Sequence, residues 1–305
     1  MKMSFDCKGK TQPDPFVFED NNQFFLYVTA DEGVEAYQSD NIFGKWTYKG
    51  VVTEFEGASI FWAPSVIKIE ETYYMYVSCV NNENFQFMHV ASANSPLGPF
   101  KNEKCLYNHF SIDSHMVKTE EGLFLWYAKN NINTDLIGTR IFVDKFLDPY
   151  TPENNPKEVI LPEFDEEKYT PNCTAERNWY TIEGPFWFKE GDWQYLMYSA
   201  GCYQDDTYHI GYAIAKTNEA NLKKVDFVKV TNEGSFSPLI IKNSFEEGTG
   251  HHSLIKHNGT YYAIYHGRDF NNTNSSKYTE RRTARICRLI VDGGKITAER
   301  FEDHI

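Results

Sequence analysis

Four side chains that can transfer protons or bind cations recur at one position of a motif that the chain repeats. They are Asp14, Asp113, Glu183 and His251. Hydrolysis of a glycosidic bond needs one carboxylic acid to protonate the leaving oxygen and a second carboxylate to act as base or nucleophile. A third carboxylate nearby raises the pKa of the acid by like-charge repulsion. Three acids that met in the fold would therefore suit this chemistry, and the histidine could orient a water molecule or a cation.

The motif that contains these residues predicts a β-hairpin. Counted onward from each starting residue, the third, fourth and tenth residues are apolar. The same pattern starts at Ala63, which makes five copies, and polar turns such as Asn258-Gly259 separate the two halves of the motif. The five starting residues are 49, 50, 70 and 68 residues apart.

Repeats of about 40–50 residues that each form a small antiparallel sheet are typical of a β-propeller. We predict an all-β fold, a single five-bladed β-propeller over residues 1–305. The longer intervals would hold insertions, among them a long loop over residues 148–178. Residues 1–13 are expected to add a strand to the last sheet. If the first strand of each blade lines the central axis, the five starting residues meet at one mouth of the channel.

The amino-acid composition limits the kinds of partner that this chain is expected to bind. The 305 residues carry a net charge of −13, which argues against a nucleic-acid partner or an anionic membrane. Aromatic residues make up 16%, which suits strand packing and offers flat faces for sugar rings. No apolar segment is long enough to span a membrane, and the first residues lack the apolar core of a signal peptide. The sequence therefore favours a cytoplasmic protein whose six cysteines are free thiols.

Two further residues are candidates for contact with a substrate. Trp62 precedes the second starting residue and could form a stacking wall for a sugar, with a core tryptophan as the equal alternative. Arg285 lies on a late strand and could bind a substrate hydroxyl or hold the charge of a carboxylate, with an exposed, arginine-rich edge as the alternative.

Four short segments together resemble the motif set of glycoside hydrolase family 43. They are QPDPF around Asp14, IDSHM around Asp113, IEGPF around Glu183 and GTGHHS around His251, and the WAP at residues 62–64 belongs with them. The resemblance runs from residue 14 to about residue 290, with the segments in the family's order and blade register. It implies a five-bladed β-propeller that acts on arabinose- or xylose-containing polysaccharides and oligosaccharides.

The resemblance also implies roles for individual residues. Asp14 would be the general base and Glu183 the general acid, in an inverting mechanism. Asp113 would raise the pKa of the acid and orient the sugar. His251 would lie over the channel, where family members often hold Ca²⁺ through water, and Arg285 is the best match for the arginine that contacts the substrate.

Within the family, the GHHS segment and the RRTARICRL strand are more similar to exo-acting α-L-arabinofuranosidases. A β-xylosidase and an endo-1,5-α-L-arabinanase are the alternatives, although many β-xylosidases carry a C-terminal β-sandwich that is not seen in these residues. A non-catalytic sugar-binding propeller would be expected to have lost part of the acidic triad, and all three acids are present. A related fructan-cleaving propeller would carry Arg-Asp-Pro and Glu-Cys, and neither occurs.

Overall fold

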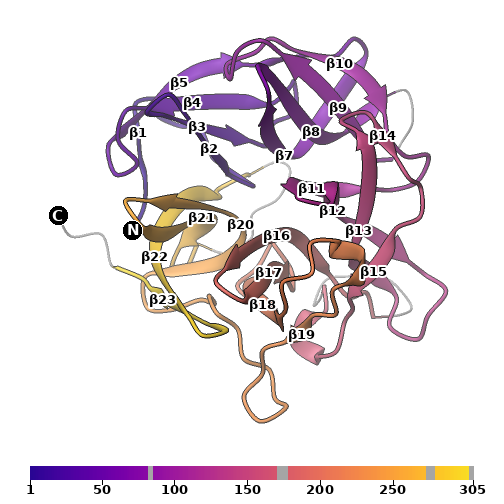
Figure 1. Ribbon diagram of the computed structural model, residues 1–305. Coiled ribbons are helices and arrows are strands. Elements are labelled where there is room, and N and C mark those ends of the chain that lie inside the picture. The colour runs from indigo at the N-terminus through magenta and orange to yellow at the C-terminus, as the bar shows by residue number, and fades with distance from the viewer. Residues whose placement is uncertain (82–84, 170–177, 273–278, 302–305) are drawn as a thin grey trace.

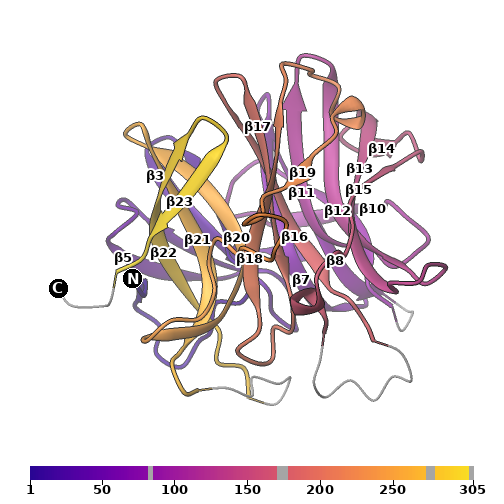
Figure 2. The same cartoon turned by 90° about the horizontal axis from the view of Figure 1, so that it is seen from below.

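The chain forms five mainly antiparallel sheets that surround a central axis (Figure 1, Figure 2). This computed structural model describes residues 1–81, 85–169, 178–272 and 279–301. The only helices in these ranges are two short 3₁₀ turns, η1 (Asp165–Glu167) and η2 (Leu222–Lys224). The structure thus confirms the predicted all-β, five-bladed β-propeller.

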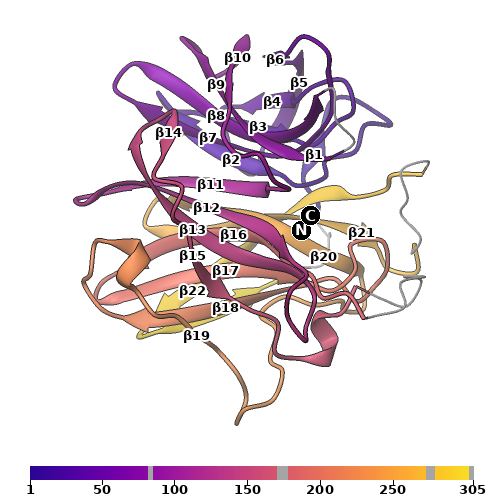
Figure 3. The same cartoon turned by 90° about the vertical axis from the view of Figure 1, so that its right-hand side faces the viewer.

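Each sheet is one blade, and its first long strand lies innermost (Figure 1). Figure 3 shows the blades from the side. Across the sheet of blade one, the strands are β1 (Ser4–Phe5), β5 (Lys45–Val51), β4 (Glu35–Ser39), β3 (Gln23–Val28) and β2 (Phe16–Asp20). Across the sheet of blade two, they are β6 (Thr53–Glu54), β10 (Phe100–Cys105), β9 (Phe87–Ala93), β8 (Thr72–Asn81) and β7 (Ala58–Ile69). Those of blade three are β11 (Ile112–Thr119), β12 (Gly122–Asn131), β13 (Gly138–Asp148) and β14 (Thr151–Pro152), with β15 (Lys157–Ile160) also paired to β13. Blade four contains β16 (Ile182–Glu190), β17 (Trp193–Ala200), β18 (His209–Lys216) and β19 (Val228–Lys229). Blade five contains β20 (Glu246–His257), β21 (Thr260–Asp269), β22 (Thr283–Asp292) and β23 (Lys295–Glu299).

Tight turns set the register of the inner hairpins. Glu70, Asn258 and Gly259 all have positive φ, at 54°, 49° and 76°, in two-residue turns between paired strands. Such turns match the right-handed twist of the two strands that they connect. The turn predicted at Asn258-Gly259 is confirmed.

The five hydrophobic clusters each lie between neighbouring blades. Between blades one and five, for example, Val17 and Phe24 pack with Ile255 and Ile264. The other four clusters fill the remaining interfaces around the ring. No blade has a core of its own, so each inner strand is held in place from both sides.

The N-terminal segment joins the first blade to the last. Strand β1 pairs in parallel with β5 of blade one, while Met1 and Met3 form backbone hydrogen bonds with Ile286 and Ala284 of β22. The prediction that residues 1–13 add a strand to the last sheet is therefore only partly right. The insertion predicted as a loop over residues 148–178 also differs, because β14 and β15 extend the sheet of blade three; residues 170–177 lie outside the described ranges.

No helix in the described ranges has the length and apolar character needed to cross a membrane.

Candidate active site

The starting residues of the motif share an unusual backbone. Asp14, Ala63, Asp113 and His251 all have positive φ, between 42° and 61°. Such a conformation is costly for residues other than glycine and commonly marks functional sites. The pairing of three of the inner strands, β7, β11 and β20, shifts register at or beside these residues. A bulge of this kind re-aims a side chain, here toward the axis.

In blade four the predicted frame is wrong by one residue. The residue with positive φ is Gly184, at 57°, and it occupies the register of the other starting residues. Glu183 therefore lies one residue before the bulge. The sequence pattern could not detect this. Phe186, Trp187 and Phe188 satisfy the third and fourth positions in either frame, and the apolar tenth residue, Trp193, fits only the frame that starts at Glu183.

Asp14 is held by partners from several blades. Its Oδ1 lies 3.0 Å from Nη1 of Arg282 and 3.2 Å from Nδ1 of His266, and its Oδ2 accepts a hydrogen bond of 2.6 Å from Thr29. Burial alone would raise the pKa of this carboxyl, but the charge of Arg282 and the contacts with His251 and His266 outweigh it and hold the pKa well below its usual value. Asp14 is therefore ionised at neutral pH.

Glu183 lies in the opposite electrostatic setting. Its Oε1 accepts a hydrogen bond of 2.6 Å from the hydroxyl of Tyr208. Burial and the negative charge of Asp14 raise the pKa of Glu183 to about 7, although Tyr208 and Arg282 act against the shift. A carboxyl with this pKa still carries its proton in a large fraction of molecules near neutral pH, as a general acid must.

Asp113 experiences the charges of both other acids. Its Oδ2 accepts a hydrogen bond of 2.9 Å from the backbone N–H of Gly184, the residue after the candidate acid. Burial, followed by the charges of Glu183 and Asp14, raises the pKa of Asp113 well above its usual value. Asp113 and Glu183 therefore titrate as a pair, and repulsion favours the retention of a proton in this pair.

His251 faces the acids from blade five. Its Nδ1 lies 3.6 Å from Oδ1 of Asp14 and 3.9 Å from Oδ2 of Asp113. Burial lowers the pKa of its imidazole, so the ring is neutral at neutral pH. The structure thus brings all four predicted axial residues together at one mouth of the propeller.

The fit of a calcium ion beside His251 is poor. Ca²⁺ takes six to eight oxygen ligands. Within the described ranges no three His, Cys, Asp or Glu side chains converge on a metal position. The axial cavity lined by Asp14, Asp113 and His251 has a volume of about 10 Å³, roughly the space of one water molecule. Calcium beside His251 stays a prediction that elemental analysis of the purified protein would check.

The structure moves the arginine of the site from Arg285 to Arg282. Arg285 is buried, and its guanidinium forms ion pairs with Glu246 at 3.4 Å and Asp269 at 2.7 Å, away from the acids. Arg282 instead contacts Asp14 and stacks over the ring of Tyr203, with 4.7 Å between Cζ and the ring centroid. The physical reason is that Arg282 precedes β22 and lies at the mouth, whereas Arg285 lies within this strand.

Trp62 lies on β7, directly before Ala63. Trp62 is 37% exposed, which excludes the alternative of a core tryptophan. The backbone N–H of Ala63 donates to Thr29, which in turn donates to Asp14, so Trp62 adjoins the network of the candidate base. Its contact with a sugar stays a prediction.

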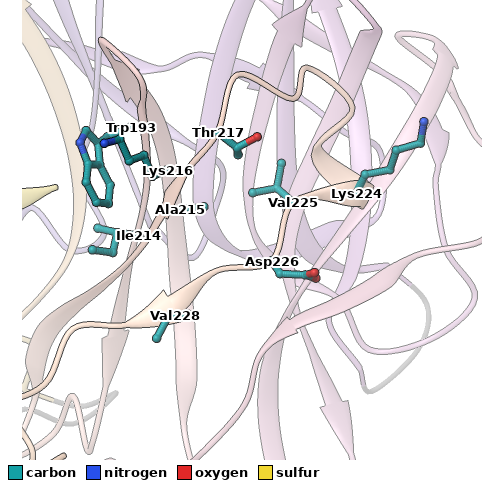
Figure 4. A pocket seen from close by; sticks show the side chains of 9 residues that line it. All are labelled: Trp193, Ile214, Ala215, Lys216, Thr217, Lys224, Val225, Asp226 and Val228. Carbon is teal, nitrogen blue, oxygen red and sulfur yellow. The ribbon is translucent and has the colours of Figure 1, made fainter.

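A pocket larger than the axial cavity lies away from the acids. It has a volume of about 390 Å³ and is formed at the outer side of blade four by residues that include Trp193, Lys216 and Val228 (Figure 4). None of the axial acids lines it, and Lys216 covers the ring of Trp193, with 5.6 Å between Nζ and the ring centroid. Size alone does not identify a site, so the chemistry belongs to the axial mouth.

Sequence reasoning missed three residues of this site, namely Tyr208, His266 and Arg282. None of them belongs to the repeated motif. Arg282 had the nearest signal, since it stands in the arginine-rich segment that drew attention to Arg285. Tyr208 and His266 have no signal in the sequence, because only the folded ring brings them to the acids.

Comparisons with known proteins address the fold and the family. A thermostable family-43 glycoside hydrolase of known structure is 27% identical, with 99% of this chain and 97% of that chain covered and a TM-score of 0.83. An endo-1,4-β-xylanase from Bacteroides thetaiotaomicron is 24% identical over 95% and 94% of the two chains, with a TM-score of 0.76. An α-L-arabinofuranosidase from Lactobacillus brevis is 18% identical over 94% and 93%, with a TM-score of 0.78. A search of curated proteins finds no significant match.

The similarities to the xylanase and to the arabinofuranosidase, at 24% and 18% identity, show the fold alone. The family is instead established by a match to the sequence of this chain. The family model described as glycosyl hydrolases family 43 matches residues 9–294, which is nearly the whole chain and includes all four axial residues. The chain therefore belongs to glycosyl hydrolases family 43.

Proposed function

We propose that this glycosidase removes terminal α-L-arabinofuranosyl residues from arabinan or arabinoxylan oligosaccharides by a single inverting displacement. The observation that supports it is the opposite shift of two buried carboxyls at one mouth of the channel. The pKa of Asp14 is held low beside Arg282, and the pKa of Glu183 is raised to about 7. One group is thus ready to accept a proton and the other to donate one.

In the proposed reaction, Glu183 donates its proton to the glycosidic oxygen as the bond from this oxygen to the anomeric carbon breaks. A water molecule on the opposite face of the sugar attacks the anomeric carbon and gives a proton to Asp14. The products are free arabinose and the shortened oligosaccharide, and Glu183 and Asp14 then exchange protons with solvent. This geometry requires carboxyls about 6.5–9.5 Å apart, so that a water molecule fits between base and sugar.

The choice of arabinofuranoside rests on the GTGHHS segment and on the strand that includes Arg285, both of which resemble exo-acting arabinofuranosidases. The experiment is hydrolysis of paired aryl α-L-arabinofuranoside and aryl β-D-xyloside substrates, with linear arabinan as a third. We expect a higher kcat/KM for the arabinofuranoside. Preference for the xyloside would make the protein a β-xylosidase, and rapid internal cleavage of arabinan would make it an endo-arabinanase.

The alternative function to be excluded is that of a sugar-binding propeller without catalytic activity. Binding of arabino-oligosaccharides by calorimetry without release of any sugar would support it. The three acids argue against this outcome, because gathering carboxyls away from water at one mouth is costly and a binding protein gains nothing from it.

A further inference from the structure

Among the described side chains, Tyr208 is the one that forms a hydrogen bond with the carboxyl of the candidate acid. It lies directly before β18, is 1% exposed, and donates its hydroxyl proton to Oε1 of Glu183 over 2.6 Å. Burial raises the pKa of this phenol well above its usual value. The hydroxyl therefore stays protonated and remains a donor throughout the working pH range.

The ring of Tyr208 is fixed from two sides. It stacks on His266 with 5.5 Å between the ring centroids and an angle of 12°. On another side it lies so close to Gly250 that a Cβ there would overlap the ring. Because His266 also accepts the backbone N–H of Asp14 over 3.1 Å, the candidate base and the ring of Tyr208 share one support.

The segment that precedes Tyr208 is fixed by Arg268. This guanidinium is fully buried and donates to the backbone carbonyls of Tyr203 and Asp205. A Cβ on Gly248 would overlap it. The two glycines of GTGHHS thus have separate roles, since Gly248 makes room for Arg268 and Gly250 makes room for Tyr208.

We propose that Tyr208 is a positioning residue that selects which oxygen of Glu183 carries the acidic proton. Since Tyr208 donates to Oε1, the proton of Glu183 is directed to Oε2, the oxygen left for the glycosidic bond. This inference rests on the proposed function, because it assigns Glu183 as the acid. Tyr208 itself transfers no proton to the substrate.

Several titratable or charged groups act on this acid or on Tyr208, and the test must keep them unchanged. They are Asp14, Asp113, Tyr169, Tyr203, His266 and Arg282, and His251 lies against Gly184, the residue after the acid. Substitution Tyr208→Phe keeps the stacked ring and removes only the hydroxyl, so these groups stay in place.

The first test compares pH profiles of kcat/KM for wild type and Tyr208→Phe. The hydrogen bond from Tyr208 lowers the pKa of Glu183, so its loss should move the alkaline limb upward by about one pH unit. We also expect kcat on an unactivated oligosaccharide to fall about tenfold or more, with a smaller loss on an aryl substrate that needs little protonation. A lower kcat with an unmoved limb would overturn the proposal.

The matched control is Tyr76→Phe. Tyr76 is also buried, and its hydroxyl donates to the backbone carbonyl of Pro149 over 2.8 Å rather than to one of the acids. This variant should lose stability without any shift of the alkaline limb. An equal shift in both variants would mean that the effect is one of packing, and would contradict the positioning role.

A second measurement is independent of turnover. Carboxyl ¹³C NMR of protein labelled at glutamate, with the Glu183 signal assigned through Glu183→Gln, gives the titration of this group directly. We expect its midpoint to rise in Tyr208→Phe, and an unchanged midpoint would overturn the proposal. If no glycoside is hydrolysed by wild type while the midpoint still shifts, the proposed function fails and the Tyr208–Glu183 contact is upheld.

Discussion

At the scale of single residues, the site separates two similar carboxyls by their surroundings. Asp14 faces Arg282, whereas Glu183 is buried beside other acids and receives only a neutral donor. The same arrangement of one stabilised carboxylate and one retained proton recurs wherever acid and base chemistry must run at one pH. The charge pattern of the mouth, more than any single contact, gives each acid its role.

The pH dependence of activity follows from these shifts. The protonated form of Glu183 is lost as the pH rises through about 7, so kcat/KM should fall on the alkaline side of that value. Asp14 stays ionised at mildly acidic pH because its pKa is lowered, so activity should persist there. A profile that rises between pH 7 and 9 would contradict this assignment.

Removal of the acid gives a second prediction. Glu183→Gln should lower kcat on an unactivated arabino-oligosaccharide by about 100- to 10,000-fold, because it deletes the proton donor. Circular dichroism should show an unchanged fold, since Gln can still accept from Tyr208. A variant with nearly full activity on this substrate would end the assignment of Glu183.

The two arginines give a matched pair of substitutions. Arg282→Lys keeps a charge but cannot reach both Asp14 and Glu280 with the planar fork of a guanidinium. We expect kcat/KM to fall about tenfold or more and the acidic limb to move upward, because the pKa of Asp14 rises. Arg285→Lys should change thermal stability and leave both limbs in place, and the reverse result would restore Arg285 as the arginine of the site.

At the scale of elements, the hairpins could be predicted and the bulges could not. Paired strands leave apolar residues at regular spacing in the sequence, and tight turns leave characteristic residue pairs such as Asn258-Gly259. The bulge beside Asp113 and the positive φ of Asp14 leave no such trace, and the apolar Trp193 ten residues after Glu183 hid the shift from Glu183 to Gly184. Local backbone strain of this kind is set by the packing around it rather than by the residue.

A buried ion pair anchors the segment that follows β15. Lys229 of β19 contacts Glu167 over 2.7 Å, with both side chains almost fully buried, and Glu167 also accepts backbone N–H groups of Glu163 and Phe164. Lys229→Met should lower the free energy of unfolding by about 3–5 kcal/mol, because it leaves a buried carboxyl without its cation. Urea denaturation measures this change.

The control is Lys256→Met, which removes an exposed pair with Glu190. Its cost should stay below about 1 kcal/mol, as for other surface pairs. Similar losses in both variants would show that burial of the Lys229 pair does not matter for stability.

At the scale of the whole molecule, the ring itself creates the site. Asp14, Asp113, Glu183 and His251 come from four blades, and packing between blades brings them to one mouth. The repeat in the sequence predicted this convergence. It could not predict Tyr208, His266 or Arg282, because these residues lie outside the repeated motif and reach the mouth only through the closure of the ring.

The most direct test of the central claim is the anomeric form of the first sugar released. Proton NMR during the first turnovers of an aryl α-L-arabinofuranoside should show the β-anomer of arabinose before mutarotation, because a water molecule activated by Asp14 attacks from the face opposite the leaving group. Initial release of the α-anomer, or transfer of the sugar to added methanol with retention, would make Asp14 a nucleophile and contradict the account.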